Sequence, residues 1–261
     1  MKIGFFDSGL GGLTIMKAVA AMLPQFDYAY YGDTANLPYG DKPEEEIYRL
    51  TLEGVKYLFE QDCLLVIIAC NTASAETARR IQNEFLSDNY PERKVLGIVV
   101  PTIEMMKYTT PTTVALIATK RTVESNKYLN ELETSNNVMV SLTQIAAPEL
   151  VPLIEMGEIE AASSQAINRI EAEAGESEVV VLGCSHYTQI KTALREHFGE
   201  SIIILSQDEI IPDKLSNYLD RHQEISEKLT GEGARTVHLT EHRPDYDHQM
   251  GVFLGGVFMA D

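Results

Sequence analysis

Residues 64–72 have the sequence LLVIIACNT, in which six apolar residues run without a break into a cysteine and two small polar residues. An unbroken apolar run of this kind is typical of a strand covered on both faces, as in a parallel sheet that lies between helices. Asn71 and Thr72 favour the start of a helix. The stretch therefore predicts a buried strand, Cys70 at its carboxyl end, and a helix directly after it.

A second stretch repeats this order. Residues 179–186 have the sequence VVVLGCSH, a buried-type strand that runs into Cys184 and small polar groups. A weaker match lies upstream, where one apolar run leads into Asp7, 63 residues before Cys70, and another leads into Thr119, 65 residues before Cys184. The matching offsets suggest two similar α/β units, each with a polar group and a cysteine at strand ends.

Short apolar runs alternate with amphipathic stretches along the whole chain, which indicates α/β architecture. Besides the two stretches above, strands are expected at residues 2–6, 28–31, 95–99, 113–118, 138–142, 202–205 and 236–240. Helices are expected at residues 13–22, 43–61, 74–85, 123–132, 148–156, 158–174, 190–198 and 208–221.

Composition excludes several classes of protein. The 261 residues include 21 Lys and Arg but 39 Asp and Glu, a net charge of −18, which argues against a nucleic-acid partner because phosphate binding needs clustered cations. Three scattered cysteines, Cys63, Cys70 and Cys184, do not make a disulfide framework or a zinc-type pair. No apolar stretch approaches the roughly 18 residues of a membrane span. We therefore expect a soluble, cytoplasmic protein with reduced thiols and no membrane partner.

The two strand-end cysteines suggest a chemistry. Ligands of open parallel sheets bind beyond the carboxyl ends of the strands, and a helix N-terminus there lowers the pKa of a thiol. If the two units face each other, one thiolate could remove a proton from carbon while the opposite thiol delivers one to the other face. The alternative is that each cysteine is a small buried hydrophobe, which is the interpretation we prefer for Cys63.

Small polar residues surround both cysteines, and their clustering fits a site for an amino-acid carboxylate, although each could also simply cap a helix. Asp7 could orient a thiol proton or bind an ammonium group. His186 could assist Cys184, since its pKa lies near neutrality. The small polar residues are Ser8, Asn71, Thr72, Thr119, Thr122 and Ser185.

Two other motifs are disfavoured. Residues 9–14 (GLGGLT) carry Thr14 where the third glycine of a dinucleotide-binding loop belongs. Residues 238–242 (HLTEH) match a helical zinc pattern, but the surrounding residues favour a strand, on which the two histidines would not converge.

Four motifs resemble those of bacterial glutamate racemase, within the cofactor-independent aspartate/glutamate racemase superfamily. They are DSGLGGL at residues 7–13, YGDTANLPYG at residues 31–40, ACNTASA at residues 69–75 and LGCSHY at residues 182–187. The resemblance covers about residues 1–219. It implies two similar three-layer α/β domains with mostly parallel sheets and pseudo-twofold symmetry, with the active site in the cleft between them. We expect residues 1–97 and 206–261 to form the first domain and residues 98–205 the second.

The resemblance also implies interconversion of L- and D-glutamate without pyridoxal phosphate, another cofactor or a metal, to supply D-glutamate for peptidoglycan. Cys70 would take the α-proton of the D enantiomer and Cys184 that of the L enantiomer. Asp7 would support Cys70, and His186 with Glu155 would support Cys184. The residues that fall where the family binds substrate are Ser8, Tyr39, Gly40, Asn71, Thr72, Thr119, Thr122 and Ser185.

The chain departs from the family pattern in places. Ser185 stands where the family usually has Thr, residues 97–101 (GIVVP) lack the usual acid, and the stretch from Arg221 onward does not match well. A racemase acting on aspartate or another amino acid, or a non-catalytic binding protein on the same scaffold, remains an alternative. Family members commonly form homodimers, and we expect the same here.

Overall fold

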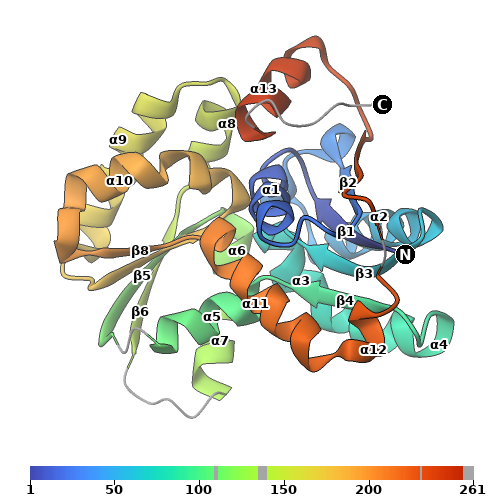
Figure 1. Ribbon diagram of the computed structural model, residues 1–261. Helices are drawn as coiled ribbons and strands as arrows, with labels where there is room; N and C mark the ends of the chain where they lie inside the picture. The colour runs from blue at the N-terminus through green and yellow to red at the C-terminus, as the bar shows by residue number, and fades with distance from the viewer. Residues whose placement is uncertain (109–110, 135–139, 230, 255–261) are drawn as a thin grey trace.

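The computed structural model describes residues 1–108, 111–134, 140–229 and 231–254, and its strands form two separate parallel sheets (Figure 1). Sheet A contains β1 (Lys2–Asp7), β2 (Tyr28–Gly32), β3 (Cys63–Ile68), β4 (Lys94–Gly97) and β9 (Arg235–Leu239). Sheet B contains β5 (Thr113–Ala118), β6 (Ser141–Ala146), β7 (Val179–Gly183) and β8 (Ile203–Leu205).

The two sheets have the same strand order. Sheet A runs β4-β3-β1-β2 and then adds β9 at its edge, and sheet B runs β8-β7-β5-β6. Every pairing in both sheets is parallel. The repeat predicted from the sequence is therefore confirmed in strand order, with β3 and β7, the strands that precede Cys70 and Cys184, in equivalent places.

Helices cover the faces of both sheets. In chain order the α-helices are α1 (Gly12–Met22), α2 (Glu44–Glu60), α3 (Asn71–Arg80), α4 (Ser87–Asn89), α5 (Val99–Tyr108), α6 (Lys120–Glu124), α7 (Lys127–Thr134), α8 (Leu150–Glu155), α9 (Ile159–Ala174), α10 (Lys191–Phe198), α11 (Gln207–Arg221), α12 (Gln223–Ser226) and α13 (Pro244–Leu254). Short 3₁₀ or π segments are η1 (Thr34–Asn36), η2 (Tyr39–Asp41), η3 (Ile81–Leu86), η4 (Ser185–Ile190) and η5 (Gly199–Ser201).

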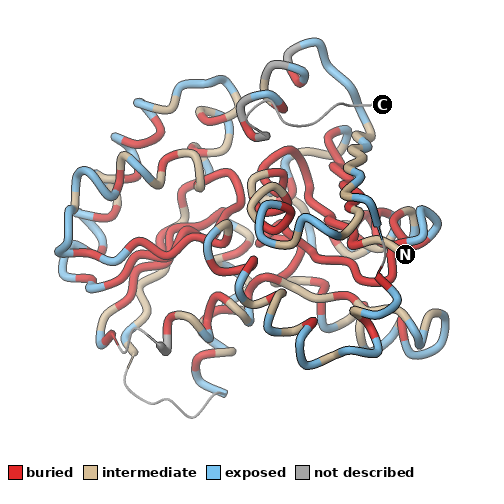
Figure 2. The backbone as a smooth tube through the Cα atoms, viewed as in Figure 1, coloured by how far each residue is buried: buried red, intermediate tan, exposed pale blue. Residues whose placement is uncertain are grey.

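Both faces of sheet A are buried, which explains its unbroken apolar strands. In β3, Leu65 and Ile67 belong to the larger apolar core, which also includes the strands of sheet B, whereas Val66 and Ile68 belong to a smaller core beneath α2. Figure 2 shows the same pattern, with buried strands inside and exposed residues on the outer sides of the helices. The central strands are therefore rigid supports for the loops at their ends.

Three expectations from the sequence were wrong in detail. The strand expected at residues 95–99 ends at Gly97, and α5 begins at Val99. The strand expected at residues 138–142 is β6, Ser141–Ala146, and the first residues of the expected range lie outside the described residues. The helix expected at residues 123–132 is divided into α6 and α7 at Asn126, whose φ of 51° interrupts the helix. The helix α13 was not expected.

Candidate active site

Each sheet has one position where the chain changes direction across the sheet, and two polar residues lie at each of these positions. In sheet A the chain leaves β1 toward one side and later returns to the other side of β1 through β3, and in sheet B β5 and β7 are related in the same way. Such switch points are where open parallel sheets bind ligands. Asp7 and Cys70 lie at the first switch point, and Thr119 and Cys184 lie at the second.

The first thiol lies where β3 ends and α3 begins. The backbone N–H of Ala73 donates to Cys70 Sγ at 3.5 Å, and Ser8 Oγ lies 3.3 Å from the same sulfur. Burial and the negative charge of Asp7 raise the pKa of Cys70 to about 12, and the contacts with Ala73 and Ser8 oppose this rise only in part. The N–H of Ala73 at the helix N-terminus does lower the pKa of this thiol, but desolvation outweighs it, so the lowered pKa expected from the sequence is wrong.

The second thiol has a histidine and a carboxylate beside it. His186 Nδ1 lies 3.9 Å from Cys184 Sγ, and His186 Nε2 lies 3.2 Å from Glu155 Oε1. Burial lowers the pKa of His186, but the contacts with Cys184 and Glu155 outweigh burial, so that its pKa lies well above the ordinary value. This direction favours the protonated imidazole, which bridges the thiol and the carboxylate.

Asp7 links the two halves of the site. Its Oδ1 accepts a hydrogen bond from the backbone N–H of Gly9 at 2.8 Å, and its Oδ2 accepts one from Ser185 Oγ at 3.0 Å. Burial raises the pKa of Asp7, while the positive charge of His186 and these two hydrogen bonds lower it. A carboxylate from the end of β1 is thereby joined to the residue that directly follows Cys184.

Three threonine hydroxyls join α3 to α6. Thr72 Oγ1 lies 2.9 Å from Thr119 Oγ1 and 3.3 Å from Thr122 Oγ1, and the last two oxygens are 2.9 Å apart. Thr119 is also the N-cap of α6. The cluster therefore holds the starts of two helices, one from each half of the molecule, against each other.

Asn71 adds a hydrogen-bond donor to this region. Its Oδ1 accepts hydrogen bonds from the Tyr128 hydroxyl at 2.8 Å and from Gln207 Nε2 at 3.3 Å. Its Nδ2 is buried and has no partner among the described residues. Because a buried amide without a partner is costly, Nδ2 is available to a bound acceptor such as a carboxylate.

A cavity of about 220 Å³ brings most of the predicted residues together. Asp7 and Thr122 are not among its lining and lie behind it, where they bond to residues that do line it. The predicted residues that line the cavity are Ser8, Tyr39, Gly40, Cys70, Asn71, Thr72, Thr119, Glu155, Cys184, Ser185 and His186. Lining residues that the sequence analysis missed are Leu37, Pro38, Asp41, Lys120, Pro148, Val151 and Pro152.

Asp33 was also missed, although it follows β2 at the same edge of the sheet as Asp7. The Tyr39 hydroxyl donates to Asp33 Oδ2 at 2.6 Å, and Thr240 Oγ1 donates to Asp33 Oδ1 at 2.9 Å. This buried carboxylate therefore holds the loop that carries Tyr39 and Gly40 over the cavity. Its position directly after a strand was the signal that could have identified it.

Gly11 is required where α1 approaches the second half of the site. A Cβ atom at this position would lie 2.7 Å from His186 Nδ1 and 2.8 Å from the His186 backbone nitrogen. Real Cβ contacts are not that short, so a side chain here would displace His186. The glycine-rich turn at residues 9–12 thus serves close packing between the two halves.

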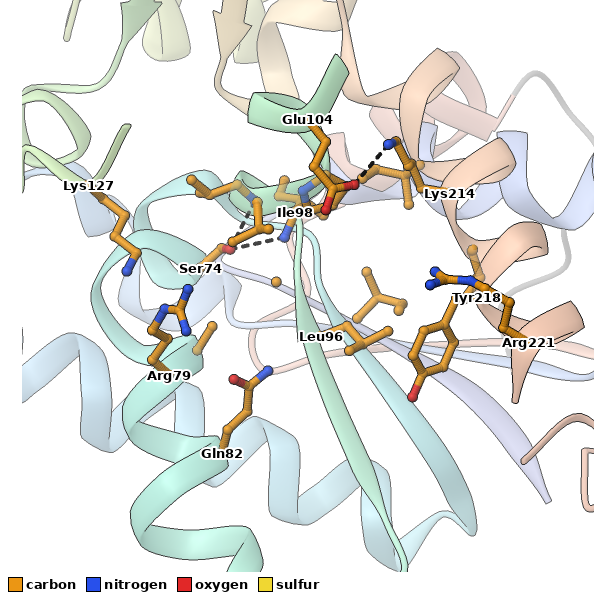
Figure 3. A pocket seen from close by; sticks show the side chains of 18 residues that line it. Ser74, Arg79, Gln82, Leu96, Ile98, Glu104, Lys127, Lys214, Tyr218 and Arg221 are labelled. Atoms are coloured by element: carbon orange, nitrogen blue, oxygen red, sulfur yellow. Dashed lines mark hydrogen bonds and ion pairs between the residues drawn. The ribbon is translucent and has the colours of Figure 1, made fainter. Parts of the chain in front are cut away.

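A second cavity, of about 330 Å³, is lined by residues of α3, β4, α5 and α11 among others and by none of the three cysteines (Figure 3). Ser74 Oγ accepts hydrogen bonds there from the backbone N–H groups of Ile98 at 3.0 Å and Val99 at 3.4 Å. Across the cavity, Lys214 of α11 pairs with Glu104 of α5 at 2.8 Å. These contacts hold the segment in which the chain passes from β4 to α5.

The histidine pattern at residues 238–242 does not lie on one helix. His238 is in β9, which ends at Leu239, and His242 Nε2 lies 3.4 Å from Asp247 Oδ1. Among the described residues, no group of three or more His, Cys, Asp or Glu side chains is arranged to hold a metal ion. None of the helices in the described ranges is long and apolar enough to cross a membrane.

Comparison with known proteins gives a consistent result. The family model for Asp/Glu/Hydantoin racemase matches residues 14–207. A glutamate racemase from Roseobacter denitrificans is 36% identical over 236 residues, which cover 85% of this chain and 86% of the relative.

Solved structures that superpose on this chain point to the same family. A glutamate racemase isoform from Bacillus anthracis superposes with a TM-score of 0.87 at 26% identity and covers 100% of this chain and 96% of its own. The glutamate racemase from Francisella tularensis, solved in complex with D-glutamate, superposes with a TM-score of 0.85 at 25% identity and covers 99% of this chain and 95% of its own. With its duplicated parallel sheets and two strand-end thiols, this chain belongs to the Asp/Glu/Hydantoin racemase family.

Proposed function

We propose that the protein is a glutamate racemase that interconverts L- and D-glutamate with two cysteines and no cofactor. The observation that carries the proposal is that Cys70 and Cys184, one from the end of each sheet, line the same cavity. Among the relatives, the proteins named above are glutamate racemases, and one was solved with D-glutamate bound. Two thiols on one small cavity suit a substrate with a single acidic C–H bond.

The reaction needs two proton transfers. In the D-to-L direction the Cys70 thiolate takes the proton from Cα, the electron pair remains on the substrate as a carbanion conjugated with the carboxylate, and the Cys184 thiol gives its proton to the opposite face. The enzyme then holds a neutral Cys70 and a Cys184 thiolate, which is the form that accepts L-glutamate. Exchange of protons with water restores the first form.

The neighbours of each thiol suit these roles. The N–H of Ala73 and the Ser8 hydroxyl, both in contact with Cys70 Sγ, stabilise its thiolate. At Cys184 the protonated His186, supported by Glu155, stabilises the thiolate in the same way. Asp7 couples the two sides through Ser185 and places negative charge near the incoming ammonium group.

Donors for the two carboxylates come from both halves. We propose that Asn71 Nδ2, the hydroxyls of Thr72, Thr119 and Ser185, and the loop containing Tyr39 and Gly40 bind them, with Thr122 holding the threonine cluster in place. The buried, unpartnered Asn71 Nδ2 supports this assignment. Preorganised donors of this kind also stabilise the negative charge that develops on the α-carboxylate during proton removal.

The test is a circular-dichroism racemisation assay without added cofactor, on both enantiomers of glutamate, aspartate and other amino acids. We expect turnover of glutamate, and loss of it in Cys70→Ala and in Cys184→Ala, with Cys63→Ala as the control that retains it. Turnover in either active-site variant would contradict the two-thiol mechanism. Preferential turnover of aspartate would indicate the alternative racemase, and binding without turnover would indicate a non-catalytic protein.

The remaining expectations extend this function. We propose that the product D-glutamate supplies peptidoglycan synthesis and that the protein works in the cytoplasm, where its thiols stay reduced. We also propose a homodimer, and a first domain of residues 1–97 and 206–261 against a second of residues 98–205. Light scattering tests the dimer, and D-glutamate auxotrophy on gene deletion tests the pathway.

A further inference from the structure

The last helix of the described chain lies against the active site. Figure 1 shows α13 beside α8 and α1, after the chain has left the edge strand β9. Tyr246, Met250 and Phe253 are buried on one face of α13, with exposed fractions of 1%, 7% and 4%. Their spacing of four and three residues is that of a helix face packed on a core, and α13 contacts α1.

Two side chains of α13 contact the pair that supports Cys184. Gln249 Nε2 donates a hydrogen bond to the backbone carbonyl of Glu155 at 2.7 Å. The ring of Phe253 meets the ring of His186 edge-on, at a centroid distance of 5.9 Å and an interplanar angle of 90°. One element thus contacts both members of the pair.

The physical effect of each contact is specific. Glu155 is the last residue of α8, and terminal helix carbonyls have no partner within the helix. The Gln249 amide satisfies this carbonyl and so fixes the backbone from which the Glu155 carboxylate reaches His186. The edge-on ring of Phe253 restricts rotation of the imidazole, which must present Nδ1 to Cys184 and Nε2 to Glu155 simultaneously.

We propose that Gln249 and Phe253 are positioning residues for proton transfer at Cys184, so that the C-terminal helix is a functional part of the second half of the active site. The proposal rests on the proposed racemase function. The helix α13 lies in the stretch from Arg221 onward, which does not match the family motifs well, and the proposal gives this stretch a role. Neither residue lines the cavity, so both act through His186 and Glu155.

The test uses Gln249→Met, which removes the donor at similar size, and Phe253→Leu, which removes the ring edge but keeps an apolar side chain. Racemisation is followed with substrates deuterated at Cα, separately for each enantiomer. We expect kcat to fall about tenfold to a hundredfold, the scale of loss from a small misplacement of a reacting group, with a smaller change in KM. The α-deuterium isotope effect should rise for L-glutamate, from which Cys184 takes the deuteron, and not for D-glutamate.

Controls separate positioning from stability. Met250→Ala removes a buried side chain from the same helix, and we expect it to lower the melting temperature without changing the ratio of the two isotope effects. Phe253→Tyr keeps the ring, and we expect it to restore the wild-type ratio. Equal isotope effects for both enantiomers in Gln249→Met and Phe253→Leu would overturn the proposal while the racemase function stands. Wild-type protein that does not racemise glutamate would overturn both.

Discussion

Cys70 is held in an environment that favours its neutral form. Burial and the charge of Asp7 raise its pKa to about 12, so the free enzyme carries little Cys70 thiolate near neutrality. The contacts with Ala73 and Ser8 oppose this and become stronger when the sulfur is charged. In the proposed mechanism a substrate ammonium group in the cavity, with Asp7 behind the lining, adds positive charge and so favours the thiolate. We therefore propose that Cys70 loses its proton most readily when substrate is bound.

The Ser8 hydroxyl should influence the pH dependence of proton removal by Cys70. Since the Cys70 thiolate is the proposed base and its pKa is raised, kcat/KM should increase as the pH rises through neutrality. Ser8→Ala removes a hydrogen bond to a charged group, worth about 1.5–3 kcal/mol, and should shift the rising limb by roughly one to two units toward higher pH. The profile of kcat/KM against pH measures this.

Ser8→Thr, which keeps the hydroxyl, is the control and should retain the wild-type profile. A limb in Ser8→Ala that is unchanged, or that moves toward lower pH, would contradict the assigned role of the hydroxyl. Because racemisation has an equilibrium constant of one, kcat/KM must shift equally for both enantiomers, which provides an internal check.

At this scale the sequence allowed much of the site to be predicted. Cys70, Asn71, Cys184 and Ser185 could be chosen because each directly follows a strand with an unmistakable apolar run. Asp33 could have been chosen in the same way, because it directly follows β2. Lys120 could not, because its place in the cavity lining depends on how loops from distant elements fold over the cavity. The raised pKa of Cys70 also could not be predicted, since it depends on the degree of burial.

Among the elements, α5 shows where apolar pattern alone fails. Residues 95–99 are almost entirely apolar and were expected to form one strand, yet β4 ends at Gly97. The reason lies in another element, since Ser74 of α3 accepts hydrogen bonds from the N–H groups of Ile98 and Val99 and so caps the start of α5. Likewise α13 depends on tertiary packing of Tyr246, Met250 and Phe253, which its sequence barely suggests.

Ser74→Ala tests this account of the junction. The substitution leaves two buried N–H groups without their acceptor, and each unsatisfied group costs about 1–3 kcal/mol. We expect the free energy of unfolding to fall by about 2–6 kcal/mol, the sum for the two groups, measured by urea denaturation. Ser87→Ala, which removes an exposed hydroxyl bonded to the Asn83 carbonyl, is the matched control and should change stability little. Equal stabilities of the two variants would refute the capping role.

The whole molecule should be sensitive to alkali. Burial raises the pKa of Cys63 from 9.0 to about 12, as it does for Cys70. Above pH 9 the unfolded chain therefore loses thiol protons that the folded chain keeps, and stability must fall as the pH rises from about 9 toward 12. Below pH 9 both states hold the protons and these thiols cause no pH dependence.

Cys63→Ala should reduce that decline. Cys63 lies in β3 away from the cavity lining, so the substitution removes one buried titrating thiol without touching the reaction. We expect the slope of unfolding free energy against pH, between pH 9 and 11, to become less steep by up to about 1.4 kcal/mol per pH unit. An unchanged slope would show that Cys63 does not titrate differently in the two states.

The architecture itself was largely predictable because it repeats. The repeated order of strand, cysteine and helix in the sequence predicted two similar units. The strand orders β4-β3-β1-β2 and β8-β7-β5-β6 show these two units. Within the described residues the edge strand β9 has no counterpart in sheet B, and its register beside β2 depends on partners far away in the chain. Local pattern therefore predicted the strand at residues 236–240, which is β9, but not its place at the edge of sheet A.

In the proposed mechanism one sulfur acts on each face of the same carbon. It is tested most directly by starting the reaction with unlabelled D-glutamate in deuterium oxide and stopping it after a small fraction has turned over. We expect L-glutamate that carries deuterium at Cα, while the remaining D-glutamate is still unlabelled, because the thiol that donates a proton is not the one that accepted a proton. Deuterium that appears equally early in both enantiomers, or L-glutamate that retains the original proton, would contradict it.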